Sequence, residues 1–261
     1  MTPSLQLPAA VSGDRTRAQQ RARDWAEIQE RMLVPLYEAV HARLEVGPAT
    51  SVLGLGCGSG LSLLLAAARG AQVVGLEPVP ERRELAEARG LPMLAARDAS
   101  AHAIVTVLDG LAASPDPLAL AQSAARLTAR GGHVVLATWG PRERCESAPV
   151  LALARRLADP LLRQLPDAFA LSAPGALERV VLGAGLRPDG GGLVPCPFAY
   201  PDLDSAVRGF LASGWFDAAL AFSGEKQLRK ELTEALFPYL REDGTLRMRN
   251  VFRYAIGQKL H

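Results

Sequence analysis

Short apolar runs alternate with amphipathic segments through the first half of the chain. Five runs are expected to be strands, at residues 51–55, 72–77, 91–97, 102–108 and 133–138. Between most of them, apolar residues recur at intervals of three and four, which indicates helices. Strands that are apolar almost throughout and separated by helices are typical of a parallel sheet covered on both faces. The pattern therefore predicts a doubly wound α/β fold.

Helical spacing also flanks this region on both sides. Residues 17–44 predict one or two amphipathic helices, with Pro35 placed to kink or split them. Beyond residue 140 the spacing is mainly helical until residues 247–260, which are expected to be the last strand. Residues 1–14 carry prolines and a glycine without periodicity, so we expect a flexible N-terminal arm there.

The rest of the chain is predicted to be one domain, because no linker-like stretch divides it. This domain is expected to span residues 15–261. Within it we expect a cofactor-binding core at 45–140 and a mainly helical substrate or lid region at 141–245, inserted before the last strand.

A glycine-rich turn directly follows the first predicted strand. It reads Gly56-Cys57-Gly58-Ser59-Gly60 and leads into a predicted helix. Glycine allows positive φ and the close approach of a ligand, and the first N–H groups of the helix are free to bind it. The spacing GxGxG differs from the GxGxxG of dinucleotide sites and from the P-loop. Open α/β sheets bind ligands at this edge, so the turn is a candidate binding loop.

An acidic residue completes a nucleoside-binding pattern. Glu77 ends the second predicted strand. A carboxylate there can accept hydrogen bonds from both hydroxyls of a ribose, as in nucleoside-binding α/β folds. The alternative is a tight turn followed by a solvated acid. Strand, glycine turn, helix, strand and acid in this order favour a nucleoside-containing ligand.

Composition and charge narrow the possible partners. The 261 residues include 29 Lys and Arg against 27 Asp and Glu, a net charge of +2, so no nucleic-acid partner is expected. The three cysteines and four histidines lack the spacing of metal ligands or of a disulfide framework, so we expect no metal. The run at 61–68 is too short to span a bilayer, and no signal peptide is evident. We expect a cytoplasmic monomer or homodimer without a membrane partner.

Three motifs resemble a known family. VLGLGCGSG, VVGLEP and LTARGGHVVLATWG look like class I S-adenosylmethionine-dependent methyltransferases, in particular the small-molecule branch that includes ubiquinone and menaquinone biosynthesis enzymes. The resemblance implies a Rossmann-like, seven-stranded sheet whose last strand is antiparallel. It also implies S-adenosylmethionine as methyl donor, released as S-adenosylhomocysteine. The residues implied to bind it are Gly56, Cys57, Gly58 and Gly60 at the methionine portion, Glu77 and Pro78 at the ribose, and Asp98 and Ala99 at the adenine.

The chain departs from this family at three places. Gly54 stands where the first strand usually carries an acid that helps to hold the methionine end of the cofactor. Glu77 replaces the commoner Asp, and the segment between Asp98 and the next predicted strand is short. If the missing acid weakens the site, we expect Gly54→Asp to tighten cofactor binding.

Direct methyl transfer requires mainly alignment of the reacting groups and exclusion of water. A general base is needed only when the acceptor, such as a phenol or alcohol, must lose a proton. Two polar residues on the predicted strand at 102–108 are catalytic candidates, Asp109 at its carboxyl end and His102 at its amino end. The alternative roles are a cap or loop position for Asp109 and a surface loop position for His102.

Aromatic residues occur in the segments expected to cover the site. They are Trp25, Tyr37, Trp139, Trp215 and Phe216. They predict an apolar acceptor pocket, with ordinary core packing as the alternative. We therefore expect methyl transfer to O, N or C of a small, largely apolar metabolite. The abundance of Ala, Leu, Arg and Gly suits a bacterial source, and natural product biosynthesis is the expected setting.

Three other interpretations remain open at this point. A protein of this fold that has lost methyl transfer could catalyse a cyclisation or rearrangement, or only bind a ligand. A nucleotide-dependent oxidoreductase is disfavoured by the GxGxG spacing. A binding or scaffold protein with an inactive pocket is the third.

Overall fold

The computed structural model describes residues 9–95, 101–162, 165 and 167–260. Its main sheet has six strands in the order β2-β1-β3-β4-β8-β5. Their bounds are Ser51–Leu55 (β1), Gln72–Leu76 (β2), His102–Val107 (β3), Thr128–Trp139 (β4), Arg187–Pro195 (β5) and Val251–Gln258 (β8). Strands β1 to β4 pair in parallel, and β8 is antiparallel to both β4 and β5. The predicted α/β fold with a reversed last strand is confirmed.

β5 joins the main sheet from the region at 141–245 that the sequence predicts to be mainly helical. The strand expected at residues 91–97, in contrast, is missing from the described residues. Here the chain forms only an isolated bridge between Met93 and Gly75. Two hydrogen bonds hold it, from Gly75 N to the Pro92 carbonyl at 2.9 Å and from Leu94 N to the Gly75 carbonyl at 2.8 Å. Pro92 has no N–H to extend the ladder. Residues 96 and 97 lie outside the described part. Because residues 91–95 form a bridge and no strand, the described main sheet has six strands where seven were expected.

Helices cover both faces of the sheet because successive strand residues point to opposite sides. Ile104 and Val135 belong to the core formed with α2 (Val34–Arg43) and α3 (Leu61–Ala68). Val105 and Val134 face the other core, formed with α5 (Pro117–Arg126) and α7 (Ala176–Gly183). Strands apolar on both faces thus become the middle layer of three.

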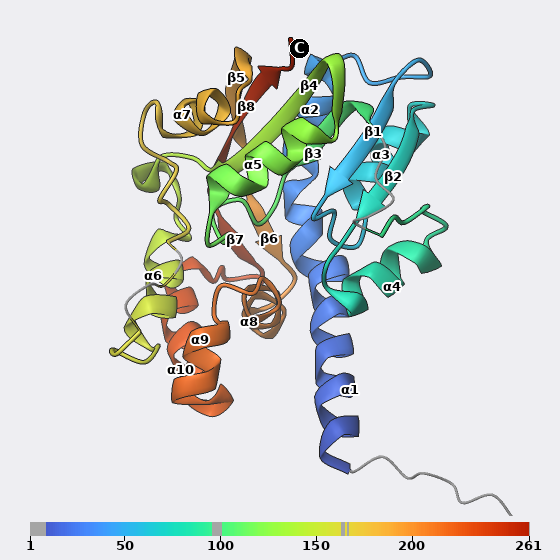
Figure 1. Ribbon diagram of the computed structural model, residues 1–261. Coiled ribbons are helices and arrows are strands. Elements are labelled where there is room, and N and C mark those ends of the chain that lie inside the picture. The colour runs from blue at the N-terminus through green and yellow to red at the C-terminus, as the bar shows by residue number, and fades with distance from the viewer. Residues whose placement is uncertain (1–8, 96–100, 163–164, 166, 261) are drawn as a thin grey trace, which may run out of the picture.

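A helical region, called the cap below, lies at the ends toward which β1 and β2 point (Figure 1). Its elements are α6 (Ala148–Arg156), β6 (Phe198–Tyr200), α8 (Leu203–Ala212), α9 (Asp217–Ser223), α10 (Glu225–Leu236) and β7 (Leu246–Met248), with short 3-10 turns at Arg142–Arg144 and Phe237–Tyr239. β6 and β7 form a separate two-stranded sheet. Helix α4 (Pro80–Ala88) follows β2 and packs against the N-terminal helix.

The N-terminal helix is broken where it passes the sheet. Helix α1 (Ala9–Asp24) continues into a π-helical turn at Trp25–Gln29 and a 3-10 turn at Glu30–Leu33 before α2 begins. The break therefore precedes Pro35, which sits in the first turn of α2. We call Trp25–Leu33 the N-terminal break. Helix α1 begins at Ala9, inside the segment expected to be an arm, and residues 1–8 lie outside the described residues.

In the described part of the chain, no helix combines the length and the apolar character needed to cross a membrane.

Candidate active site

The glycine turn lies at the carboxyl end of β1 with three residues in the left-handed region. Gly56, Gly58 and Gly60 have φ angles of 68°, 61° and 86°. At Gly60 a Cβ would also lie 2.1 Å from Leu91 Cδ1, so both backbone and packing require glycine there. The turn leads directly into α3, whose first N–H groups face this edge of the sheet. The sequence expectation of a tight glycine turn is met by this backbone.

Glu77 ties the glycine turn to the end of β2. Its Oε2 accepts a hydrogen bond from Gly58 N at 2.7 Å, and its Oε1 accepts one from Val79 N at 2.9 Å. The residue is 5% exposed, and burial raises the pKa of its carboxyl while these two hydrogen bonds oppose the rise. A carboxylate has about four acceptor positions, so each oxygen keeps one for a ligand hydroxyl.

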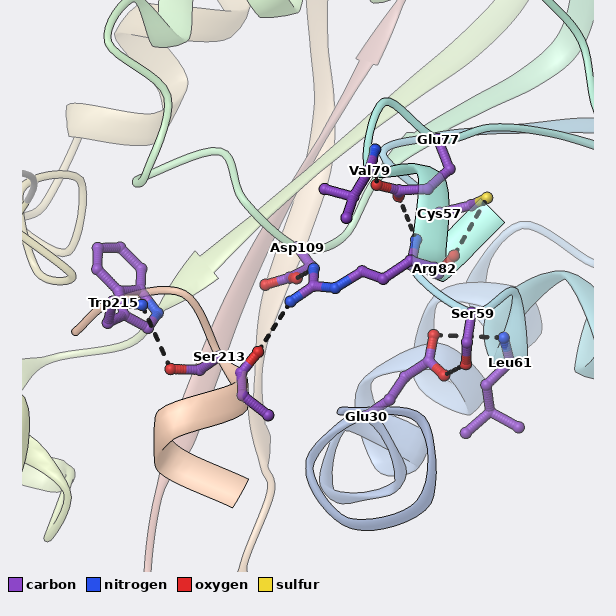
Figure 2. Close-up of polar contacts among 12 residues, drawn as sticks. Glu30, Cys57, Ser59, Leu61, Glu77, Val79, Arg82, Asp109, Ser213 and Trp215 are labelled. Atoms are coloured by element: carbon purple, nitrogen blue, oxygen red, sulfur yellow. Dashed lines mark hydrogen bonds and ion pairs between the residues drawn. The ribbon is translucent and has the colours of Figure 1, made fainter. Parts of the chain in front are cut away.

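A second carboxylate, Glu30, reaches the same loop from the N-terminal break. It accepts hydrogen bonds from the Ser59 hydroxyl and, at 3.4 Å, from Leu61 N at the start of α3 (Figure 2). Arg89 Nη1 lies 3.5 Å from its Oε2. Glu30 is 1% exposed, and burial raises the pKa of its carboxyl, opposed by Ser59 and Arg89. Nothing in the local sequence distinguishes Glu30 from a solvated helix residue, so sequence reasoning missed it.

Arg82 crosses the middle of the site from α4. Its guanidinium lies 4.3 Å from the centroid of the Trp25 ring and donates a hydrogen bond to the Ala212 carbonyl at 3.0 Å. Its Nη1 is 4.0 Å from Asp109 Oδ2, as Figure 2 shows. Burial raises the pKa of the Asp109 carboxyl, and the Arg82 charge opposes that rise. Sequence reasoning also missed Arg82, because its contacts come from α1 and the cap.

Two cavities meet at Asp109. The smaller, of about 20 Å³, lies under the glycine turn and is lined by Trp25, Glu30, Tyr37 and Gly58 among others. The larger, of about 300 Å³, is lined by α1, the start of α4 and the segment around Trp215. The smaller has room for about one water molecule, whereas sites for drug-sized ligands hold about 300–1,000 Å³. Arg82 borders the larger cavity beside Asp109.

The space beside Gly54 is filled by other side chains. A Cβ on Gly54 would lie 2.8 Å from Cys57 Cβ and 3.2 Å from Leu63 Cδ1. On the neighbouring strand, a Cβ on Gly75 would lie 2.8 Å from Cys57 Sγ. The two paired glycines thus make a hollow for Cys57. Burial raises the pKa of its thiol to about 12, which suits a filler and not a nucleophile.

The sequence matches a family described as a methyltransferase domain over residues 17–187. This range contains the glycine turn, Glu77, Glu30 and Arg82. The chain belongs to this methyltransferase family.

Curated relatives cover a part of the same region. A ubiquinone biosynthesis O-methyltransferase from Xanthomonas oryzae is 31% identical over 150 residues, which are 52% of this chain and 53% of the relative. One of the same name from Vibrio cholerae is 36% identical over 100 residues, covering 33% of this chain and 41% of the relative. The chain thus matches about half the length of these relatives or less.

Solved structures share the fold of this methyltransferase-family chain. The E. coli protein YjhP has a TM-score of 0.55 at 16% identity and covers 91% of this chain and 98% of its own. The [4+2]-cyclase SpnF has a TM-score of 0.51 at 12% identity, covering 87% of this chain and 80% of its own. At these identities the similarity concerns the fold alone.

The structure gathers most of the expected cofactor residues. Gly56, Cys57 and Gly58 line the smaller cavity, and Gly60 caps α3. Pro78 follows Glu77 and is exposed. The expected adenine-binding residues Asp98 and Ala99 lie outside the described residues.

The aromatic and catalytic candidates separate into two groups. Trp25 and Tyr37 line the smaller cavity, and Trp215 lines the larger one. Trp139 is instead packed among Phe169, Phe198 and Phe252, and Phe216 is buried beside Phe210, so both serve the core. Asp109 lines both cavities, whereas His102 begins β3 at the amino end of the sheet. The structure thus brings Asp109 to the site and leaves His102 away from it.

Among the described residues, no group of three or more His, Cys, Asp or Glu side chains is arranged to hold a metal ion.

Proposed function

We propose that this protein is an S-adenosylmethionine-dependent methyltransferase that methylates a hydroxyl group of a small, largely apolar molecule. The observation that carries the proposal is Glu77, held by Gly58 N at 2.7 Å and Val79 N at 2.9 Å at the end of β2. A carboxylate so placed presents its remaining acceptor positions to the two hydroxyls of a ribose. The membership of the methyltransferase family supports the same assignment.

The donor groups around the turn fit this cosubstrate. Trp25 Nε1 is buried without a hydrogen-bond partner and faces Gly58, and a Cβ on Gly58 would fill the space between them. The carboxylates of Glu30, Glu77 and Asp109 outnumber the nearby guanidiniums of Arg82 and Arg89, which suits a cation. Arg82 lies over Trp25 beside these groups, and we propose that it moves away from Trp25 when the cosubstrate binds.

S-Adenosylmethionine supplies a methyl group on a positively charged sulfur. The protein has to align an acceptor with it and exclude water. Asp109, whose pKa is raised by burial, is the group that takes the proton of a hydroxyl acceptor as the O–C bond forms and the methyl–sulfur bond breaks, with S-adenosylhomocysteine as the leaving group. Because Asp109 lines both cavities, it can contact a hydroxyl acceptor in the larger cavity while the cosubstrate is bound at the glycine turn.

The residues that line the larger cavity indicate the chemical character of the acceptor. The cavity walls include Ala22, Val79, Ala113 and Trp215, which suit an apolar ring or chain. Charged groups at the same cavity, Arg82 and Asp109 among them, leave room for a hydroxyl-bearing end. The O-methyltransferase names of the bacterial relatives support attack by oxygen and a bacterial metabolite as acceptor.

Calorimetric titration with S-adenosylmethionine and S-adenosylhomocysteine tests the cofactor assignment first. We expect micromolar binding of both. A panel of phenols and alcohols, incubated with isotope-labelled S-adenosylmethionine and analysed by mass spectrometry, then tests methyl transfer. Failure of both ligands to bind would overturn the proposal. Tight binding without any methylated product would favour a cyclisation or rearrangement, the activity in the name of the structural neighbour SpnF.

A further inference from the structure

Trp25 presents a buried donor with no acceptor. The Trp25 residue is 3% exposed, and its indole Nε1 has no hydrogen-bond partner. An unsatisfied buried N–H is unfavourable by about 1–3 kcal/mol, so such groups are rare unless a ligand completes them. The indole nitrogen lies 2.9 Å from the position of a Cβ on Gly58, which places it against the binding turn.

Glu30 presents a buried acceptor beside this donor. Its Oε1 lies at the same distance, 2.9 Å, from the position of a Cβ on Gly58. Ser59 and Leu61 use one acceptor position on each of its oxygens, which leaves about two free. Arg89 is 3.5 Å away and also donates to Ser59 O and Oγ, at 2.8 Å and 2.6 Å, so its charge is shared.

Gly58 joins this pair to the ribose site. Its N–H donates to Glu77, while its α-carbon faces Trp25 and Glu30. Gly58 thus lies between the two, and a nucleoside held at Glu77 can extend its 5′ substituent over Gly58 toward the N-terminal break. In S-adenosylmethionine this substituent ends in an α-ammonium and an α-carboxylate. A carboxylate acceptor next to an N–H donor is the matching pair of groups.

We infer that Glu30 and Trp25 bind the amino-acid end of the cosubstrate, Glu30 the ammonium and the Trp25 N–H the carboxylate. The inference rests on the proposed function. It assigns to the N-terminal break the work of the carboxylate that β1 lacks at Gly54, a position closed by Cys57 and Leu63. Trp25 begins the π-helical turn and Glu30 begins the 3-10 turn that follows it, so both residues belong to the irregular part of the N-terminal helix, where functional residues often lie.

Two ligands that differ only at this end provide the test. S-Adenosylhomocysteine carries the amino acid, and 5′-methylthioadenosine has the same nucleoside and thioether without it. We expect Glu30→Gln and Trp25→Phe each to weaken S-adenosylhomocysteine binding about tenfold or more and to leave methylthioadenosine binding unchanged. Glu77→Ala weakens both ligands. Calorimetry measures all the dissociation constants, and no turnover is required.

Matched variants keep the test decisive. Glu27→Gln removes an exposed carboxylate from the same π-helical turn and should change neither ligand. Trp25→Phe removes a donor that is unpartnered in this structure and keeps a ring under Arg82, so its thermal unfolding should match wild type even if Glu30→Gln unfolds. Equal losses for both ligands, or no loss for either, would overturn the inference. Wild-type protein that binds neither ligand would instead overturn the proposed function.

Discussion

Two halves of the site hold the glycine turn by different means. On the sheet side, Glu77 binds the N–H groups of Val79, two residues ahead, and of Gly58, 19 residues back across the β1–β2 unit. On the opposite side, Glu30 and Trp25 come from the N-terminal break, and Arg82 links α4 to Ala212, 130 residues away. The first half depends on backbone hydrogen bonds within a rigid sheet. The second depends on side chains from separate segments, so it is the half that can rearrange for a ligand.

The largest effect should come from Asp109, where the two halves meet. Asp109→Asn removes the proposed base, and we expect kcat for a hydroxyl acceptor to fall about 10²–10⁴-fold with little change in cofactor affinity. Stopped assays with labelled cosubstrate measure the rate. Because only the ionised carboxylate accepts a proton, the wild-type rate should fall as the pH drops through a pKa that burial holds above the usual aspartate value. An unchanged rate in the variant would remove Asp109 from catalysis.

The sheet half should be the more sensitive half for nucleoside binding. Glu77→Ala removes two charge-assisted hydrogen bonds to the ribose, and we expect S-adenosylhomocysteine affinity to fall about 100-fold or more. Titration calorimetry gives the value. Glu87→Ala, an exposed residue paired with Arg83 on α4, is the control and should bind normally. A change below threefold at Glu77 would mean that the ribose lies elsewhere.

Gly54→Asp tests whether the sheet half can regain the acid that β1 lacks. The new Cβ would lie 2.8 Å from Cys57 Cβ, so we expect the free energy of unfolding to drop by about 1–3 kcal/mol without any gain in affinity. Urea denaturation measures the loss. Gly47→Asp is the matched control, since its nearest neighbours are 3.8 Å and 3.9 Å away. Tighter cofactor binding by Gly54→Asp would contradict this account.

The smallest effect is expected at Arg82, on the side of the turn opposite the sheet. Arg82→Ala removes the guanidinium that has to leave Trp25 before the cosubstrate enters, and so we expect S-adenosylhomocysteine to bind about three- to tenfold more tightly. The pKa of Asp109 should rise further, because Arg82 is the charge that lowers it, and the acid limb of the rate profile should move to higher pH. Arg83→Ala, the neighbouring arginine paired with Glu87, should change neither quantity. Weaker binding by Arg82→Ala would show that Arg82 holds the ligand.

The sheet half could be predicted because its determinants are local. Short runs that are apolar almost throughout predict buried strands, and the closely spaced glycines predict the turn, where Gly56, Gly58 and Gly60 have positive φ. Glu77 could be chosen since it ends the strand that follows this turn. The expected strand at 91–97 was wrong for a related reason: its apolar residues fit a strand, but only Met93 finds a partner in β2.

The roles of the aromatic residues expected at the site could not be predicted in the same way. Trp139, Trp215 and Phe216 all carry aromatic rings in segments that flank the site, yet Trp139 and Phe216 are packed in the core and Trp215 lines a cavity. Residue type alone does not separate these outcomes, because a core and a pocket wall use the same side chains.

The α/β fold, the family and the glycine turn with Glu77 can be predicted from the amino-acid sequence, since they follow from the periodicity and spacing of neighbouring residues. The positions of Glu30 beside the turn, of Cys57 in the space at Gly54 and of Arg82 over Trp25 become known from the folded structure. Each of these contacts joins segments that are remote along the chain. Such contacts are set by how helices pack on the sheet, which no local pattern of residues encodes.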